Sequence, residues 1–108
     1  MIFLKIIYTK SYISTYKKLK NHIKEKEKLD IILLYISSAD DFNYIKNDSL
    51  AKVYNFERLK HNLNEFYSFR LSKLFRLIVR PTNNGIEVEL VYISSNHYDD
   101  FNKDKVRL

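Results

Sequence analysis

Five side chains in the second half of the sequence have the types needed to cleave a phosphodiester. Glu57 is a carboxylate that can accept a proton, Arg70 and Arg76 carry fixed positive charge, and His97 is followed directly by Tyr98. An imidazole has an ordinary pKa of roughly 6.5, so it can donate a proton near neutral pH. An acid, a base and a cation facing a developing negative charge suffice for this cleavage without a metal. The five residues are useful only if the fold brings them together.

Each of these residues also has an ordinary structural interpretation. Glu57 is followed by Arg58 and lies near Lys60, so it could be a surface carboxylate in an ion pair. A lone histidine such as His97 is more often structural than catalytic, and Tyr98 could be one of many aromatic residues at the rim of a core. The position of His97 directly after an apolar β-type run favours a functional role, because side chains at strand ends project into clefts.

The elements that would position these residues are strands. Alternating apolar and polar residues predict strands over 53–59, 66–71, 75–81 and 86–94. Asn84-Gly85 is the strongest hairpin signal and predicts a two-residue turn. That register places Arg80 opposite Glu89 as an ion pair. It places Arg76 opposite Ile93, which offers no carboxylate, so we expect Arg76 to bind an anion.

The position of Arg70 depends on the turn that precedes Arg76. A three-residue loop, 72–74, would place Arg70 directly opposite Arg76 on one face of the sheet. A two-residue turn would place the two arginines on opposite faces, and the sequence leaves both turns open. Two guanidinium groups side by side repel each other unless an anion lies between them.

The first half of the sequence reads as one strand followed by helices. We expect a strand over 2–8 and a helix over 11–27, with Ser11 as its N-cap. Residues 29–38 fit either a strand or a helix, and an apolar stripe at helical spacing favours the helix, which would form a hairpin with the preceding one. A short helix capped by Ser38 would follow over 39–46. The order β-α-α-β-β-β-β predicts an α+β fold.

The composition predicts one small domain, residues 1–108, that is soluble and cytoplasmic. The net charge is +6, from 19 basic and 13 acidic residues, which favours polyanionic partners, although an AT-rich coding bias also produces lysine. With no cysteine, neither a disulfide nor a thiolate zinc site can form. No run approaches the roughly 18 apolar residues of a membrane span, and the N-terminus does not resemble a signal peptide.

Several of these segments together resemble the RelE/ParE toxin superfamily, most closely its YoeB-type branch. The resemblance covers about residues 55–98 and rests on Tyr67-Ser-Phe-Arg-Leu71, Phe75-Arg-Leu-Ile78, the block 57–63 and the closing His97-Tyr98. It implies a helical hairpin packed on a twisted, mostly antiparallel sheet. It also implies ribosome-dependent cleavage of mRNA without a cofactor or metal, and neutralisation by a cognate antitoxin.

The resemblance also implies roles for individual residues. Glu57 matches the general base and His97 the general acid. Arg76 matches the arginine on the transition-state phosphate, with Arg70 as its auxiliary partner, and Tyr98 matches the adjacent tyrosine that contacts the substrate. The expected contacts to the RNA backbone are Lys60 and Lys73.

Two departures from the family and several alternatives remain open. Close relatives end near the equivalent of Tyr98, whereas here a possible extension over 99–108 begins with Asp99-Asp100, which would weaken phosphate binding if it folded inward. The segment 34–52 is also longer than usual. The HigB-type branch closes with the reverse order, Tyr-His, so the branch is undecided.

The alternative functions are a ParE-like toxin that binds a protein such as DNA gyrase and a simple RNA- or ribosome-binding module. The expected partners are mRNA on the ribosome and an acidic-tailed antitoxin. Either a dimer or a hetero-oligomer with that antitoxin is compatible with the sequence.

Overall fold

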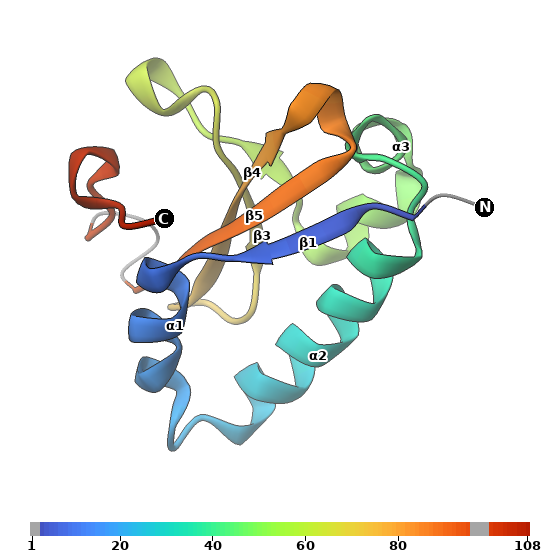
Figure 1. The fold of residues 1–108 in the computed structure, drawn as a ribbon. Helices are drawn as coiled ribbons and strands as arrows, with labels where there is room; N and C mark the ends of the chain where they lie inside the picture. Colours follow the sequence, from blue (N-terminus) through green and yellow to red (C-terminus); the bar gives the residue numbers. More distant parts are fainter. Residues whose placement is uncertain (1–2, 96–99) are drawn as a thin grey trace.

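The structure is a computed structural model that describes residues 3–95 and 100–108, and it has helices packed on a five-stranded sheet (Figure 1). The strands are β1 (Lys5–Tyr8), β2 (Glu57–Arg58), β3 (Tyr67–Arg70), β4 (Arg76–Thr82) and β5 (Glu87–Ser94). Their order is β1-β5-β4-β3-β2, with β1 parallel to β5 and the other pairs antiparallel. The predicted α+β class and the mostly antiparallel sheet are confirmed.

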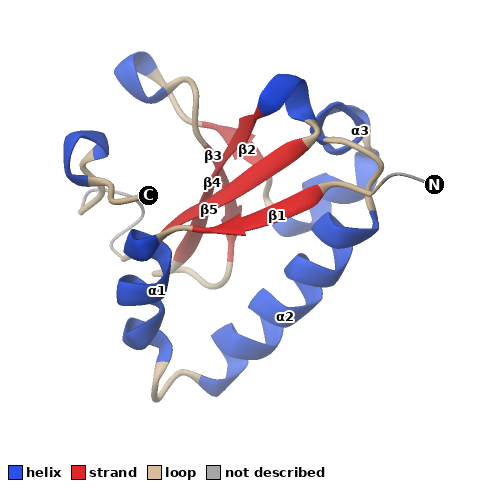
Figure 2. Ribbon diagram, viewed as in Figure 1, coloured by secondary structure: helices blue, strands red, loops and turns tan. Residues whose placement is uncertain are grey.

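The α-helices lie in the first half of the chain, and Figure 2 shows them in blue beside the red sheet. They are α1 (Lys10–Tyr16), α2 (Ile23–Ser38) and α3 (Phe42–Asn47), and the short 3-10 turns are η1 (Lys17–Leu19), η2 (Ser49–Tyr54), η3 (His61–Leu63), η4 (Asn83–Gly85) and η5 (Lys103–Lys105). The helical interpretation of residues 29–38 is therefore confirmed. No helix in the described residues is long and apolar enough to cross a membrane.

The predicted helix boundaries were wrong in three places. The first helix ends early, in a 3-10 turn, so residues 24–28 belong to α2 and not to the end of α1. The N-cap of α1 is Thr9, not Ser11: the Thr9 hydroxyl accepts a hydrogen bond from Tyr12 N (3.1 Å) and donates to the carbonyl oxygen of Leu90 (2.8 Å). For α3 the cap is the Asp41 carboxylate, not Ser38. Tertiary contacts and carboxylate capping decided these positions.

Two apolar clusters lie on opposite faces of the sheet. The larger cluster lies between the sheet and the helices and includes Leu29, Ile32 and Ile36 of α2, all nearly inaccessible to solvent. The smaller cluster lies on the other face and consists of Leu59, Phe66, Ile78, Val91 and Phe101. Successive residues of β4 alternate between the two clusters: Leu77 and Val79 lie in the larger one and Ile78 in the smaller one.

The C-terminal residues 100–108 cover part of the face that the helices leave open. In Figure 1 the sheet lies between α2 and this red segment. The ring of Phe101 packs on Phe66 and Tyr92 at centroid distances of 5.1 and 5.4 Å. Lys103 Nζ donates to the carbonyl oxygen of Asn62 (2.9 Å), and the backbone of Arg107 exchanges hydrogen bonds with the N-terminal turn of α1. The extension is therefore an integral part of the fold.

The β4–β5 hairpin differs from the predicted one at both ends. Thr82 lies opposite Glu87, and the connection is the turn η4, with positive φ at Asn83, Asn84 and Gly85, in place of a two-residue turn. The register near the turn is still the predicted one. Farther along, a β-bulge between Ile78 and Val79 shifts the pairing by one residue.

The first strand predicted in the second half, residues 53–59, is mostly wrong. The turn η2 occupies its beginning, and Asn55 adopts a left-handed conformation at φ 52°. Only Glu57 and Arg58 pair with β3, so β2 is a very short edge strand. A left-handed residue interrupts the strand conformation that the apolar pattern favoured.

Candidate active site

Three of the five predicted catalytic residues lie on one face of the sheet. Glu57 is opposite Ser68, and Arg70 is opposite Arg76. Ser68 and Arg70 are two residues apart on β3, so their side chains point to the same face, which is the face of the smaller apolar cluster. Of the two turns left open by the sequence, the three-residue loop is the one that forms.

Sheet geometry sets the scale of this arrangement. Arg70 and Arg76 are direct cross-strand neighbours, whereas Glu57 lies two strands and two residues away from Arg76. With standard spacings the Cα atoms of Glu57 and Arg76 are about 12 Å apart. Long side chains extending from both sides can therefore meet a single nucleotide between them.

The predicted pairing of Arg76 was wrong. Its neighbour on β5 is Ser94, not Ile93, because of the β-bulge between Ile78 and Val79. The Arg76 side chain is almost fully buried, at 4% exposure, whereas Arg70 is exposed. Arg70 is therefore the guanidinium that solvent reaches directly, and Arg76 is set within the sheet beside it.

Glu57 is exposed and does not have the ion pairs considered from the sequence. Within the described residues, no ion pair joins Glu57 to Arg58 or Lys60. Arg58 points to the other face of the sheet, where its guanidinium lies 5.8 Å from the ring centroid of Tyr67. The carboxylate of Glu57 is thus open to solvent on the same face as the two arginines.

Ser68 is a buried polar residue in this face that the sequence did not bring to notice. It lies between Glu57 and Ile78 in the sheet, at 1% exposure, and its hydroxyl oxygen has no hydrogen-bond partner among the described residues. A buried hydroxyl without a partner costs about 1–3 kcal/mol. Strand alternation places Ser68 on the same face as Arg70, but its pairing with Glu57 depends on the register between β2 and β3, which the sequence does not reveal.

His97 and Tyr98 lie outside the described residues, as does Asp99. The residues on either side are described: the backbone N–H of Ser95 donates to Asp100 Oδ1 (3.1 Å), and the Ser95 hydroxyl donates to Asp100 Oδ2 (2.9 Å). These bonds join the two ends of the segment at the end of β5, next to Ser94, the neighbour of Arg76.

Asp100 is held by Lys18 of the turn η1 and by Ser95, which directly follows β5. Lys18 Nζ lies 2.7 Å from Asp100 Oδ2 and also donates to the carbonyl oxygen of Ile93 (3.0 Å). Burial alone would raise the pKa of the Asp100 carboxyl, but hydrogen bonds from Lys18 and Ser95 hold that pKa below its ordinary value. The inward-folding carboxylate that would compete with a phosphate is therefore not found at Asp100.

The two lysines predicted to contact RNA flank this face at opposite ends of β3. Lys73 lies in the loop between β3 and β4, next to the arginine pair, and Lys60 follows the end of β2. Both are exposed. Neither lies between Glu57 and the arginines, so they can act on the flanking parts of a bound chain.

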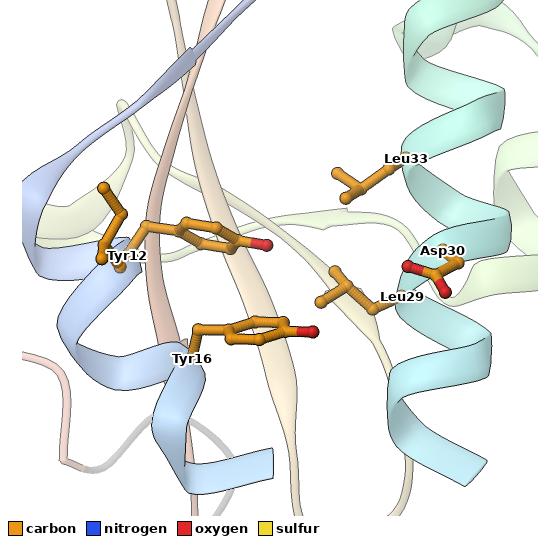
Figure 3. A pocket seen from close by; sticks show the side chains of 6 residues that line it. Tyr12, Tyr16, Leu29, Asp30 and Leu33 are labelled. Carbon is orange, nitrogen blue, oxygen red and sulfur yellow. The ribbon is translucent and has the colours of Figure 1, made fainter. Parts of the chain in front are cut away.

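Two of the cavities formed by the described residues lie on the helix side of the sheet, opposite this face. One, of about 360 Å³, is at the β2 edge and includes Lys46, Lys52 and Arg58 in its lining. The other, of about 220 Å³, lies between α1 and α2, where Tyr12 and Tyr16 point towards Leu29 and Leu33 (Figure 3). Burial raises the pKa of the Tyr12 phenol, which therefore stays neutral.

The sequence matches no known family profile and no curated protein. Solved structures do match the fold. The YoeB/ParE toxin from Agrobacterium tumefaciens aligns with a TM-score of 0.60 at 19% identity, over 85% of this chain and 98% of that one. YafQ from E. coli strain BL21(DE3) aligns at 0.62 and 16% identity, over 86% and 93% of the two chains.

A third structure, the YoeB-YefM complex from Staphylococcus aureus, aligns with a TM-score of 0.59 at 21% identity. The alignment covers 86% of this chain and 97% of that one. The expected fold is therefore confirmed: this chain has the fold of the RelE/ParE toxins, in which helices pack on one face of a mostly antiparallel sheet.

Proposed function

We propose that this protein is a single-domain toxin, residues 1–108, of a type II toxin–antitoxin system and that it cleaves mRNA on the ribosome. The observation that carries the proposal is the placement of Glu57, Arg70 and Arg76 on one open face of a RelE-like fold. Acidic and basic groups on a single face are what a phosphodiester cleavage needs. The net charge of +6 supports a polyanionic substrate.

The proposed reaction proceeds by attack of the ribose 2′-OH. Glu57 accepts the proton of the 2′-OH, and the 2′-oxygen forms a bond to the adjacent phosphorus. Arg76, assisted by Arg70, stabilises the negative charge of the pentavalent intermediate. His97 donates a proton to the departing 5′-oxygen as its bond to phosphorus breaks, and Tyr98 holds the neighbouring nucleotide. The products are a 2′,3′-cyclic phosphate and a 5′-OH, and no metal takes part in any step.

The exposed lysines Lys60 and Lys73 extend the site along the RNA backbone. Their ammonium groups displace counterions from phosphates, so their contribution falls as the salt concentration rises. Because they flank the face at opposite ends of β3, one contact lies on each side of the cleaved bond.

An antitoxin is the proposed protein partner. Several of the structures with this fold are complexes, among them YoeB-YefM from Staphylococcus aureus and DinJ-YafQ from E. coli. A basic protein such as this one fits a small partner with an acidic, partly disordered tail. We propose that such a partner is encoded next to this protein and that the two form a hetero-oligomer.

Cleavage can be tested with purified protein and translating ribosomes. Replacing either proton-transfer residue, by Glu57→Ala or His97→Ala, should lower the cleavage rate on the order of 10²–10⁴-fold. The matched control is Glu27→Ala, which removes an exposed carboxylate of α2. This variant should cleave mRNA at the rate of the unmodified protein. Undiminished cleavage by a variant that carries both Glu57→Ala and His97→Ala would overturn the mechanism.

The second candidate is a ParE-like toxin that inhibits a protein target such as DNA gyrase. The near-complete burial of Arg76 favours it, because a binding protein does not need that guanidinium to reach a substrate. This function predicts inhibition of gyrase supercoiling by the purified protein and DNA damage on induction, with intact mRNA. A simple RNA- or ribosome-binding module would instead tolerate loss of Glu57 and His97 but lose affinity, steeply with salt, when lysines are removed.

A further inference from the structure

A basic cavity of about 360 Å³ lies on the helix side of the β2 edge, next to the candidate active site. Its cations come from three separate elements: Lys46 from α3, Lys52 from η2 and Arg58 from β2. Apolar side chains, including those of Ile45 and Ala51, line the same cavity. None of these three cations belongs to the site derived from the sequence.

The cations of this cavity are not neutralised within the fold. In residues 3–95 and 100–108, no carboxylate lies within 4.0 Å of the charged nitrogens of Lys46, Lys52 or Arg58. The two acidic residues in the lining are Asp48 and Glu57, and the side chain of Glu57 points to the opposite face of the sheet. Positive charge is therefore in excess in the cavity.

Asp48 already has structural partners. Its carboxylate accepts a hydrogen bond from the Tyr35 hydroxyl (2.8 Å) and another from Leu50 N (3.2 Å). These bonds fix the carboxylate at the N-terminus of η2. Much of its capacity to compete with an added anion is thus already used.

An aromatic block holds two of the cations in place. Arg58 Nε donates to the carbonyl oxygen of Asn64 (2.5 Å), and its guanidinium lies over the ring of Tyr67. Lys46 Nζ lies 5.9 Å from the centroid of the same ring. That ring stacks on Phe56 with an interplanar angle of 1° and a centroid distance of 5.3 Å. Cations fixed in this way lose little freedom when they bind an anion.

We propose that this cavity binds a backbone phosphate of the RNA that flanks the cleavage site. The inference rests on the proposed function and extends its site around the edge of the sheet. Glu57 and Arg58 are consecutive on β2 and point to opposite faces, and β2 is the edge strand. An RNA chain with its reacting ribose at Glu57 can pass around this edge and place a flanking phosphate among Lys46, Lys52 and Arg58.

The test is the binding of a short, fluorescently labelled single-stranded RNA whose riboses are all 2′-O-methylated. Such an RNA cannot be cleaved by 2′-OH attack, so its affinity is measured independently of catalysis. The cavity variant is Lys46→Gln with Lys52→Gln, and the matched control is Lys10→Gln with Lys24→Gln, which removes two exposed lysines of α1 and α2. The melting temperature of each variant shows that it remains folded.

The proposal predicts a specific loss in the cavity variant. Its affinity should fall about tenfold, and the slope of log K against log salt should become shallower by about 0.7, because one phosphate of the single strand is no longer neutralised. The control should change the affinity less than about twofold and leave the slope as it is.

Two outcomes would overturn the proposal. Equal losses in both variants would assign RNA binding to the general surface charge. Unchanged RNA binding in the cavity variant, together with weaker binding to the antitoxin, would assign the cavity to the protein partner. Failure of the proposed function would give a different result. The unmodified protein would bind the RNA and the cavity variant would bind it more weakly, but the unmodified protein would not cleave mRNA on ribosomes.

Discussion

Two arginines of β4 lie on the same face of the sheet, four residues apart, and have different neighbours within the sheet. Arg80 is balanced by Glu89, at 2.7 Å, and by Glu65, at 3.6 Å, and its guanidinium lies over the ring of Phe66. Arg76 has another arginine, Arg70, as its cross-strand neighbour. At one end of the strand an arginine is paired with carboxylates, whereas at the other end two arginines lie side by side on the face where we propose that the substrate phosphate binds.

The largest expected effect is the loss of mRNA cleavage when Arg76 is replaced. Arg76→Gln keeps a polar side chain of similar length but removes the charge that faces the developing negative charge, so cleavage of mRNA on ribosomes should fall by roughly 10²–10³-fold. Arg80→Gln is the matched control and should keep the rate within about threefold. Equal losses in the two variants would remove the distinction between the two ends of β4.

The second effect is a loss of folding stability when Arg80, at the other end of β4, is replaced. Arg80→Ala leaves Glu89 half-buried without its partner and should lower the free energy of unfolding by about 2 kcal/mol. Urea denaturation measures this loss, and cleavage by the folded variant should be retained. A variant as stable as the unmodified protein would show that the Arg80–Glu89 pair does not support the sheet.

Replacing Arg70 should lower the cleavage rate less than replacing Arg76 does. It should also raise the free energy of unfolding, whereas replacing Arg80 lowers it. Arg70→Ala removes the auxiliary charge and should lower the cleavage rate about tenfold. It also removes the like-charge neighbour of Arg76, so the free energy of unfolding should rise by a few tenths of a kcal/mol. The comparison is with Lys73→Ala in the adjacent loop, which should leave stability unchanged. A marked loss of stability in Arg70→Ala would mean that the two arginines do not repel each other.

The smallest expected effect is at Lys18 and Asp100, where a cation is again balanced within the fold. Asp100→Asn should lower the free energy of unfolding by about 1 kcal/mol at pH 7. Because the pKa of Asp100 is held below its ordinary value, its ionised form stabilises the fold above about pH 4. That stabilisation is lost as the pH falls through the pKa of the folded state.

Chemical denaturation at a series of pH values measures this contribution. The unmodified protein and the Asp100→Asn variant should converge in stability at low pH. Serial measurements that show a constant difference down to about pH 2 would contradict the assignment. Lys18→Met should reproduce the loss at pH 7, since it removes the other partner of the same ion pair.

The sequence predicted correctly the cross-strand pairs of the β4–β5 hairpin whose register follows from their distance in residues from the turn. Arg80 and Glu89 lie between the η4 turn and the β-bulge, so their register follows from the hairpin even though the turn type was wrong. Arg76 lies beyond the bulge, and the extra residue of β5 moved its partner from Ile93 to Ser94. A bulge depends on how both faces of the sheet pack, which one strand pattern does not reveal.

Features that depend on contacts between distant segments could not be predicted. Lys46 and Lys52 lie on two short helical segments with no periodicity that relates them to Arg58, and only the packed edge of the sheet brings the three together. The role of Asp100 was also hidden, because its partner Lys18 is far away in the sequence.

The central claim is that this protein cleaves mRNA with Arg76 at the reacting phosphate. Its most direct test is induced expression followed by sequencing of RNA fragments that carry a 5′-OH. The account predicts new 5′-OH ends within translated mRNAs when the unmodified protein is expressed, and their loss with Arg76→Gln but not with Arg80→Gln. Growth arrest without new 5′-OH ends, or the same ends with Arg76→Gln, would contradict it.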